Sequence, residues 1–277
     1  MPELPEVETI ARGLRQGLRG RRIVDLFILT PEIISGDPVR YQAGILGKTV
    51  TNIWRRGKLL IFDLDEQLHL VFHLKMTGRV WIATAETEPD AHTHISFFLD
   101  DGNQLFFQDQ RRFGYSIIFS PEGLRQWDFF AMLGPEPLEI GNRDFTKIFS
   151  RRRAAIKSLL LDQHCLAGIG NIYADESLFM AGIHPACLAC DVSEARYQHL
   201  YAALRAVLQK AILLGGSSVR DYRNAAGEPG AFQNEFQVYG KKGQPCPCCS
   251  RALETMKIAG RTSTFCANCQ VKKFSRS

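Results

Sequence analysis

The sequence lacks any long uninterrupted apolar run, and it lacks a basic N-terminus. No stretch approaches the ~20 apolar residues that a membrane-spanning helix requires. The chain opens with Glu3, Glu6 and Glu8 where an export signal would carry Lys or Arg. We therefore expect neither a membrane protein nor a secreted one, and we place the protein in the cytoplasm.

Glycine and proline are also too scarce, at 23 and 12 of 277 residues, for a collagen-like or low-complexity chain. Disorder is excluded by 18 Phe, 7 Tyr and 3 Trp within a hydrophobic fraction of 45%. A chain of this length can bury a substantial core, and it favours two folded units.

The excess of basic residues is small overall but concentrated at one end. The net charge is +5, from 34 Lys and Arg against 29 Asp and Glu. Residues 241–277 contain eight of the basic residues and a single acid, Glu254. A strongly basic module on a near-neutral body is typical of a protein that binds a polyanion. On charge alone, a solubilising tail remains the alternative.

Four of the eight cysteines have the spacing of a metal site. Because nothing in the N-terminus indicates export, we expect reduced thiols and no disulfides. Cys246 and Cys249 form one C-x2-C pair, and Cys266 and Cys269 form a second pair after sixteen intervening residues. Two such pairs complete a closed tetrahedral site, so we predict one structural Zn²⁺ held by these four thiolates.

The other cysteines fit this site less well. Cys248 lies inside the first pair and could compete as a ligand, although the symmetric x2 spacing favours Cys249. Cys187 and Cys190 repeat the C-x2-C spacing, but no second pair accompanies them, and we interpret them as structural.

The periodicity divides the chain into a β-rich part and a helical part. A helix is predicted from Pro5 to about Leu18, with Leu4, Val7, Ala11, Leu14 and Leu18 on one face. Short runs rich in β-branched and aromatic residues follow at 22–29, 49–54, 58–64, 68–74, 79–82, 93–99, 103–109 and 114–119. Strands at this density predict a two-layer antiparallel β-sandwich.

A Pro- and Gly-containing stretch at 134–142 separates this part from helical segments at 155–162, 172–180 and 193–214. The fold class is therefore α+β. We assign residues 1–134 to the β-sandwich domain, 135–150 to a linker, 151–240 to a helical domain and 241–277 to a zinc-binding β-hairpin.

The N-terminus carries the most distinctive chemistry. If Met1 is removed, Pro2 has a secondary amine that can attack an aldehydic sugar carbon and form an iminium. The adjacent helix start disfavours added positive charge and helps keep this amine unprotonated. Glu3 and Glu6 lie within one turn and can exchange a proton with a sugar ring oxygen. On residue types alone, ordinary helix capping explains the same residues, so both readings stay open.

Eight motifs in a fixed order carry a family resemblance. They span residues 2–270 and read MPELPEVETI, RRGKLLIF, HLKMTG, DQRRFG, AGIGNIYADESLF, GIHP, QVYGKKG and the four-cysteine hairpin. In these motifs the chain resembles the bacterial formamidopyrimidine-DNA glycosylases, bifunctional base-excision enzymes that remove 8-oxoguanine and ring-opened purines.

The resemblance implies an N-terminal β-sandwich with a catalytic helix, a helix-two-turns-helix domain and a zinc finger. It implies that Pro2 attacks C1′ of the damaged nucleotide and remains as a Schiff base, that Glu3 protonates the sugar ring, and that Glu6 supports the site through hydrogen bonds. Successive β- and δ-eliminations then cut the strand. Lys58 is implied near the lesion phosphate and base.

The resemblance also implies a monomer that binds damaged double-stranded DNA and associates with the bacterial nucleoid when bound. An extruded nucleotide leaves a gap that wedge side chains must fill. The implied DNA contacts are His73, the gap-filling residues Met76, Arg111 and Phe113, and the phosphate contacts Lys157, Asn171, Tyr239 and Arg261. Residues 217–233 are implied to close over the everted base.

Two other functions stay in play. Endonuclease VIII-like enzymes of the same superfamily prefer oxidised pyrimidines, but they usually have Gly where this chain has Leu4, and they lack the Met76, Arg111 and Phe113 set. A non-catalytic zinc-containing DNA-binding or scaffolding protein is the third hypothesis, since a fold does not guarantee an activity. Intact Pro2, Glu3 and Glu6 argue against it.

Overall fold

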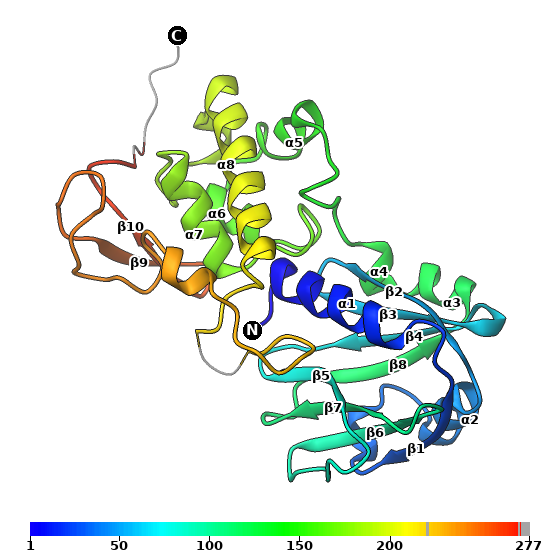
Figure 1. The fold of residues 1–277 in the computed structure, drawn as a ribbon. Helices are drawn as coiled ribbons and strands as arrows, with labels where there is room; N and C mark the ends of the chain where they lie inside the picture. The colour runs from blue at the N-terminus through cyan, green and yellow to red at the C-terminus, as the bar shows by residue number, and fades with distance from the viewer. Residues whose placement is uncertain (220–221, 271, 273–277) are drawn as a thin grey trace. The chain divides into compact units, whose positions relative to one another are not determined.

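The structure is a computed structural model that describes residues 1–219, 222–270 and 272 (Figure 1). The chain forms two compact units. We call Met1–Met132 together with Leu214–Gln233 the N-terminal unit, and Leu133–Leu213 together with the chain from Asn234 onward the C-terminal unit.

The N-terminal unit is built from the eight predicted strands, all paired antiparallel. Their bounds are β1 Ile23–Ile28, β2 Val50–Arg56, β3 Leu59–Leu64, β4 His69–His73, β5 Gly78–Ala83, β6 Thr93–Leu99, β7 Gln104–Asp109 and β8 Tyr115–Phe119. One sheet has the order β1-β6-β7-β5 and the other the order β2-β3-β4-β8. The predicted β-sandwich is confirmed.

Aromatic side chains from both sheets meet in the core between them. The Phe72 ring on β4 lies 5.3 Å from that of Phe107 on β7 and 6.1 Å from that of Phe97 on β6, measured between centroids. All three side chains are fully buried. Edge-to-face rings of this kind add to the free energy gained by removing apolar surface from water.

Helix α1, Leu4–Leu18, covers this core along the strands β2, β3 and β5 (Figure 1). The predicted apolar face is confirmed, because Leu4, Val7, Ala11, Leu14 and Leu18 are all fully buried. On the other side of the helix, the Glu8 carboxylate accepts hydrogen bonds from Arg12 Nε at 2.7 Å and from Arg55 Nε of β2 at 3.0 Å. These contacts fix the rotation of the helix and thus the direction of its first turn.

Short elements of this unit escaped the sequence prediction. They are η1 Pro31–Ile33, α2 Pro38–Ile45, η2 Asp65–Gln67, α3 Pro121–Gln126 and α4 Asp128–Ala131. Helix α2 is only two turns long, so its start is marked by a cap: Asp37 accepts a hydrogen bond from Val39 N at 2.9 Å.

The segment 214–233, which we call the crossover segment, differs from the domain assignment made from the sequence. It belongs to the N-terminal unit although the sequence placed it in the helical domain. Ala225 is buried among the residues that α1 contributes to the core, and Ser217 N donates to the Glu6 carboxylate at 2.8 Å. Neither contact leaves a periodic signal in the sequence.

The C-terminal unit contains the three predicted helical segments and one more helix. They are α5 Asn142–Phe149, α6 Ile156–Leu161, α7 Asn171–Met180 and α8 Glu194–Leu213, with the short helix η3 Ala189–Asp191. The short helix η4, Phe232–Glu235, begins in the N-terminal unit and ends in the C-terminal one. Helix α5 lies inside the predicted linker, where Phe145 and Phe149 are fully buried. Among the described residues, none of the helices is both long and apolar enough to cross a lipid bilayer.

The predicted hairpin is formed by β9 Glu254–Ile258 and β10 Arg261–Phe265. Ala259 and Gly260 connect the strands, both with positive φ of 48° and 70°, as a two-residue hairpin turn requires. Strand β10 packs against α7.

Candidate active site and nucleic-acid interface

The first turn of α1 is buried and held by Glu6. Glu3 and Glu6 are only 3% and 2% exposed, and Pro2 is buried as well. Glu6 Oε2 accepts a hydrogen bond from Glu3 N at 2.8 Å, in the manner of a capping box. The structure therefore brings Pro2, Glu3 and Glu6 together, with their carboxylates near the positive end of the helix dipole.

The crossover segment holds the other oxygen of Glu6. Ser217 donates to Glu6 Oε1 from its backbone nitrogen at 2.8 Å and from Oγ at 3.2 Å. Tyr222 Oη donates to the Glu6 carbonyl oxygen at 3.4 Å. Glu6 thus connects this segment to the turn that carries Pro2. Sequence reasoning missed Ser217 as a partner, because 211 residues separate it from Glu6.

Two adjacent glycines of the crossover segment differ in their distance from Glu6, so alanine substitutions at them test whether the position of Glu6 matters. Gly215 and Gly216 both have positive φ, of 73° and 81°, so alanine strains the backbone at either. Only at Gly216 would the new Cβ meet Glu6, at 3.0 Å from both Cγ and Oε1, whereas at Gly215 the nearest atom is Gly230 Cα at 3.8 Å.

For the activity that the family resemblance implies, Gly216→Ala is therefore expected to lower the single-turnover rate of base release about tenfold more than Gly215→Ala, since small misplacements of reacting groups are costly. Single-turnover assays on a lesion-containing duplex measure the difference. Equal rates in the two variants would show that the position of Glu6 does not determine the rate of base release.

Lys58 and His73 gather at one end of β3 and β4. Gly57 and Lys58 form the two-residue turn between β2 and β3, with Gly57 at a φ of 57°. Leu59, next to Lys58, pairs with His73 in the sheet, and both predicted residues are largely buried at 9% and 6% exposure. This register puts Lys58 and His73 at the same end of the sheet.

The protonation state of His73 follows from its surroundings. Burial, the positive charge of Lys75 and that of Lys58 lower the pKa of His73 to about 3. Nδ1 accepts a hydrogen bond from Lys75 N at 3.0 Å, so the neutral ring carries its proton on Nε2. His73 is thus a neutral donor at neutral pH, which suits a hydrogen bond to a phosphate oxygen.

This shifted pKa predicts a pH dependence of stability. In the unfolded chain His73 binds a proton below about pH 6.5, whereas in the folded chain it does so only near pH 3. The free energy of unfolding should therefore fall as the pH drops from about 6.5 toward 3. At pH 5, His73 should account for a loss of up to about 2 kcal/mol of this free energy.

Urea unfolding of wild type and His73→Gln at pH 7.5 and pH 5 measures the contribution of His73 to the pH dependence of the free energy of unfolding. We expect the wild type to lose more stability than the variant. His92→Gln, at an exposed position, should follow the wild type. If His73→Gln lost as much stability as the wild type between pH 7.5 and pH 5, His73 would not be the group that causes this loss.

Met76, Arg111 and Phe113 form one cluster on two neighbouring loops. Met76 and Phe113 are 37% and 52% exposed, although both are apolar. Arg111 Nη1 lies 3.2 Å from Met76 Sδ, and the Arg111 guanidinium lies 4.6 Å from the Phe113 ring centroid. The geometry brings the predicted trio together, with two apolar tips around a cation.

Asp109 organises this cluster and was not predicted. It is fully buried, and its carboxylate accepts hydrogen bonds from Arg111 N at 3.2 Å, Gly114 N at 2.6 Å and Thr77 Oγ1. Arg112, inside this loop, has a φ of 53°. The acid of the DQRRFG motif is therefore a loop-forming residue, which the sequence signals only as one polar residue at a strand end.

Three of the predicted phosphate contacts in the C-terminal unit depend on α7. Asn171 Nδ2 donates to the Thr262 carbonyl oxygen at 2.9 Å, one residue from Arg261. The Glu176 carboxylate accepts from the backbone nitrogens of Gln237 at 2.9 Å, Val238 at 3.0 Å and Tyr239 at 2.8 Å. Helix α7 thus places Asn171, Tyr239 and Arg261 in one region.

Lys157 has a different environment from the one predicted. It is fully buried, and its Nζ lies 2.6 Å from Asp175 Oδ1. Asp175 Oδ2 accepts from Thr264 N of β10 at 3.0 Å, and burial raises the pKa of Asp175 to about 6. Through Asp175, Lys157 of α6 is joined to α7 and to the hairpin.

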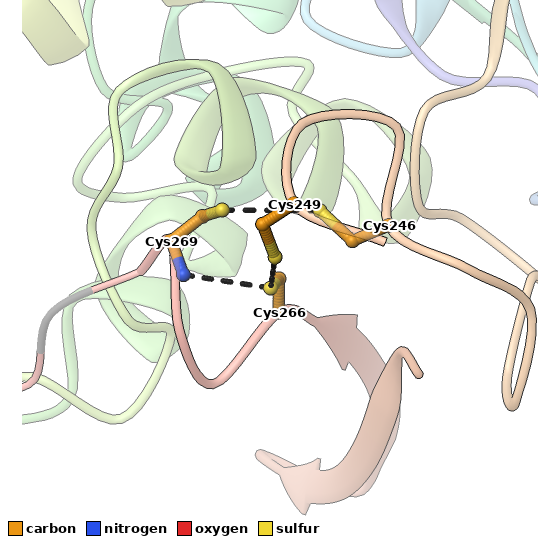
Figure 2. Close-up of side chains that lie close together, drawn as sticks. All are labelled: Cys246, Cys249, Cys266 and Cys269. Carbon is orange, nitrogen blue, oxygen red and sulfur yellow. Dashed lines mark hydrogen bonds between the residues drawn. The ribbon is translucent and has the colours of Figure 1, made fainter. Parts of the chain in front are cut away.

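The four predicted zinc ligands converge (Figure 2). All four sulfur atoms lie within 4.8 Å of one another, with Cys246 and Cys269 Sγ 3.9 Å apart and Cys249 and Cys266 Sγ 3.5 Å apart. A tetrahedron with Zn–S bonds of about 2.3 Å has S–S edges of about 3.8 Å, so the four thiols fit one Zn²⁺. Cys248 is exposed and lies outside this group.

These features together indicate the class to which the protein belongs. A zinc hairpin that carries an exposed Arg261, and a sandwich that presents a cation between two apolar tips, belong to a protein that contacts and opens nucleic acid.

Comparisons with known proteins give the family. Residues 1–116 match the formamidopyrimidine-DNA glycosylase N-terminal domain, residues 133–223 the H2TH domain of the same enzymes, and residues 243–271 a zinc finger found in FPG and IleRS. The chain belongs to the formamidopyrimidine-DNA glycosylase family.

Individual relatives agree with this assignment over their full length. Formamidopyrimidine-DNA glycosylases of Chloroflexus aurantiacus and Bacillus subtilis are 43% and 41% identical, covering 98% and 99% of this chain and 98% and 100% of theirs. The Lactococcus lactis enzyme in complex with an abasic-site-containing DNA has a TM-score of 0.91 at 36% identity, covering 97% of this chain and 99% of its own.

Proposed function

We propose that this protein is a bifunctional DNA glycosylase and abasic-site lyase of base excision repair. Its substrates are 8-oxoguanine and formamidopyrimidine lesions in double-stranded DNA. The observation that carries the proposal is the buried first turn of α1, where Pro2 precedes Glu3 and the Glu6 carboxylate fixes the turn. The membership of the family and the Lactococcus lactis complexes with abasic-site and Fapy-dG DNA support it.

The chemistry begins at the Pro2 nitrogen after removal of Met1. The amine attacks C1′ of the damaged nucleotide, the bond between C1′ and the base breaks, the proline nitrogen loses its proton and the departing base takes one up. Glu3 supplies a proton to the ring oxygen as the sugar opens, and the nitrogen and C1′ form an iminium. Loss of a C2′ proton then expels the 3′ phosphate, a second elimination expels the 5′ phosphate, and hydrolysis frees Pro2.

Other residues bind and position the DNA in this proposal. Lys58 and the neutral His73 contact phosphate near the lesion. Met76 and Phe113 fill the gap left by the extruded nucleotide, and Arg111 donates to the base left unpaired. Asn171, Tyr239 and Arg261 contact phosphates, while Zn²⁺, when bound, supplies structure and no chemistry to the reaction.

The cellular setting follows from this activity. We propose a monomer in the bacterial cytoplasm that is associated with the nucleoid when it is bound to DNA. Residues 217–233 of the crossover segment are proposed to close over the everted base.

Borohydride trapping with two duplexes tests the proposed function. One duplex carries 8-oxoguanine opposite C, and the other carries an oxidised pyrimidine. The two duplexes are otherwise identical in sequence. We expect a covalent adduct with each of them, and a higher yield with the duplex that carries the purine lesion. A higher yield from the pyrimidine would favour the endonuclease VIII-like alternative, and no adduct with either would leave only DNA binding.

A further inference from the structure

A pair of cationic side chains that the proposed mechanism does not use lies where the crossover segment meets β5. Arg79 is half-buried on β5, and its guanidinium lies 4.9 Å from the Trp81 ring centroid. Arg223 is exposed on the crossover segment. Gly227 lies next to both: its carbonyl oxygen accepts from Arg223 Nη1 at 2.9 Å, and the Cβ that another residue would have there would lie 3.7 Å from Arg79 Nη2.

Neither guanidinium has a carboxylate partner among the described residues. Arg79 Nε is buried and has no hydrogen-bond acceptor in that part of the chain. The carboxylate whose charge acts on the pKa of Arg79 is Asp90, whose Oδ1 already accepts from His92 N, Thr93 Oγ1 and Gln108 Nε2 at 2.9, 2.9 and 3.1 Å. Glu228, beside Gly227, accepts from Asn224 Nδ2.

Two guanidinium groups close together without a counterion repel each other. Burial and the charge of Arg223 lower the pKa of Arg79, so the two charges act on one another. A buried donor that lacks an acceptor also costs free energy. One anion with several oxygens removes both costs, because guanidinium groups match the geometry of phosphate.

We propose that Arg79 and Arg223 form a binding site for a phosphate-type oxyanion, which fastens the crossover segment to β5. The anion accepts from both guanidinium groups and bridges them. Its effect reaches the first turn of α1, because the same segment carries Ser217 on the Glu6 carboxylate. The proposal is independent of the glycosylase activity, since binding of the anion requires no reaction.

Amide hydrogen exchange of residues 222–230 with inorganic phosphate as the probe tests the proposal. At constant ionic strength, replacing chloride by phosphate is expected to slow exchange at least about threefold in the wild type. Arg79→Gln and Arg223→Gln should each abolish this protection. Arg40→Gln, at a side chain that is 89% exposed, serves as the matched control and should keep it.

Equal protection of the wild type and Arg79→Gln would overturn the proposal, as would no protection in the wild type. Lys substitution at position 79 keeps the charge but loses Nε, so partial protection in Arg79→Lys supports the bridging geometry.

The source of the phosphate group is separated by a second measurement. If Arg79→Gln also lowers the salt dependence of binding to an undamaged duplex, the site takes a phosphate of the DNA backbone. If only the exchange with inorganic phosphate changes, the site takes a free phosphate. Both results retain the oxyanion site.

Discussion

Replacing Pro2 by Gly is expected to lower the yield of borohydride-trapped adduct with an 8-oxoguanine duplex by about 10²-fold. The glycine amine is primary, so the imine it forms must be protonated to act as an electron sink, whereas the proline iminium is cationic without a proton. Glycine also removes the ring that fixes the backbone before α1, and misplaced reacting groups lose about two orders of magnitude.

The neighbouring buried carboxylates make this site sensitive to such a change. Glu3 N is held by the Glu6 carboxylate at 2.8 Å, so the Pro2 nitrogen stands one residue before a fixed point. Pro31→Ala, at the exposed first residue of η1, is the matched control and should trap like the wild type. Equal trapping by Pro2→Gly would exclude Pro2 as the nucleophile.

Mass spectrometry of the adduct gives an independent check. Every trapped chain should begin at Pro2, because an acylated nitrogen beneath Met1 cannot form an iminium. Adduct on chains that retain Met1 would identify another nucleophile.

The parts of the fold with strong local periodicity could be predicted from the sequence. The eight strands and α1 have alternating or helical patterns of apolar residues, and the structure has them within a few residues of the predicted bounds. Helix α5 was missed because only Phe145 and Phe149 mark its buried face, within a stretch that begins with Gly and Pro. A two-turn helix leaves too few repeats for a periodic signal.

The residues of the candidate site also differ in whether the sequence alone could predict them. The cysteine spacing predicted the thiol cluster, because all the information lies in short local repeats. Asp109 and Glu176 could not be recognised, because their carboxylates accept from backbone nitrogens that the fold brings to them. Ser217 could not be recognised either, because its partner, the Glu6 carboxylate, is distant in the sequence. For Lys157 the family resemblance implied a phosphate contact, and only the structure reveals the buried Asp175 that pairs with it.

Loss of zinc is expected to have the second large effect, on DNA affinity. The hairpin cannot hold its shape by apolar packing, because its buried cluster consists of Phe179, Val238, Leu253 and the ligands Cys246 and Cys266. For a module this small, metal binding supplies most of the folding free energy, about 10–16 kcal/mol in isolated zinc fingers. Without the metal, Arg261 is no longer held beside α7.

Cys266→Ser is therefore expected to release zinc and to weaken binding to a duplex at least about 10²-fold, with a shallower dependence of affinity on salt concentration. Cys248→Ser is the matched control, because Cys248 is exposed and outside the sulfur cluster. Metal analysis and fluorescence anisotropy at several salt concentrations give the two readouts.

The positions of the tryptophans separate local from global unfolding in this experiment. Trp54, Trp81 and Trp127 are the three tryptophans of the chain, and all belong to the N-terminal unit. Unchanged tryptophan emission in Cys266→Ser, together with weakened DNA binding, places the loss in the hairpin. A Cys266→Ser protein that keeps the wild-type salt dependence would show that the hairpin contributes no phosphate contacts, since the number of neutralised phosphates sets that slope.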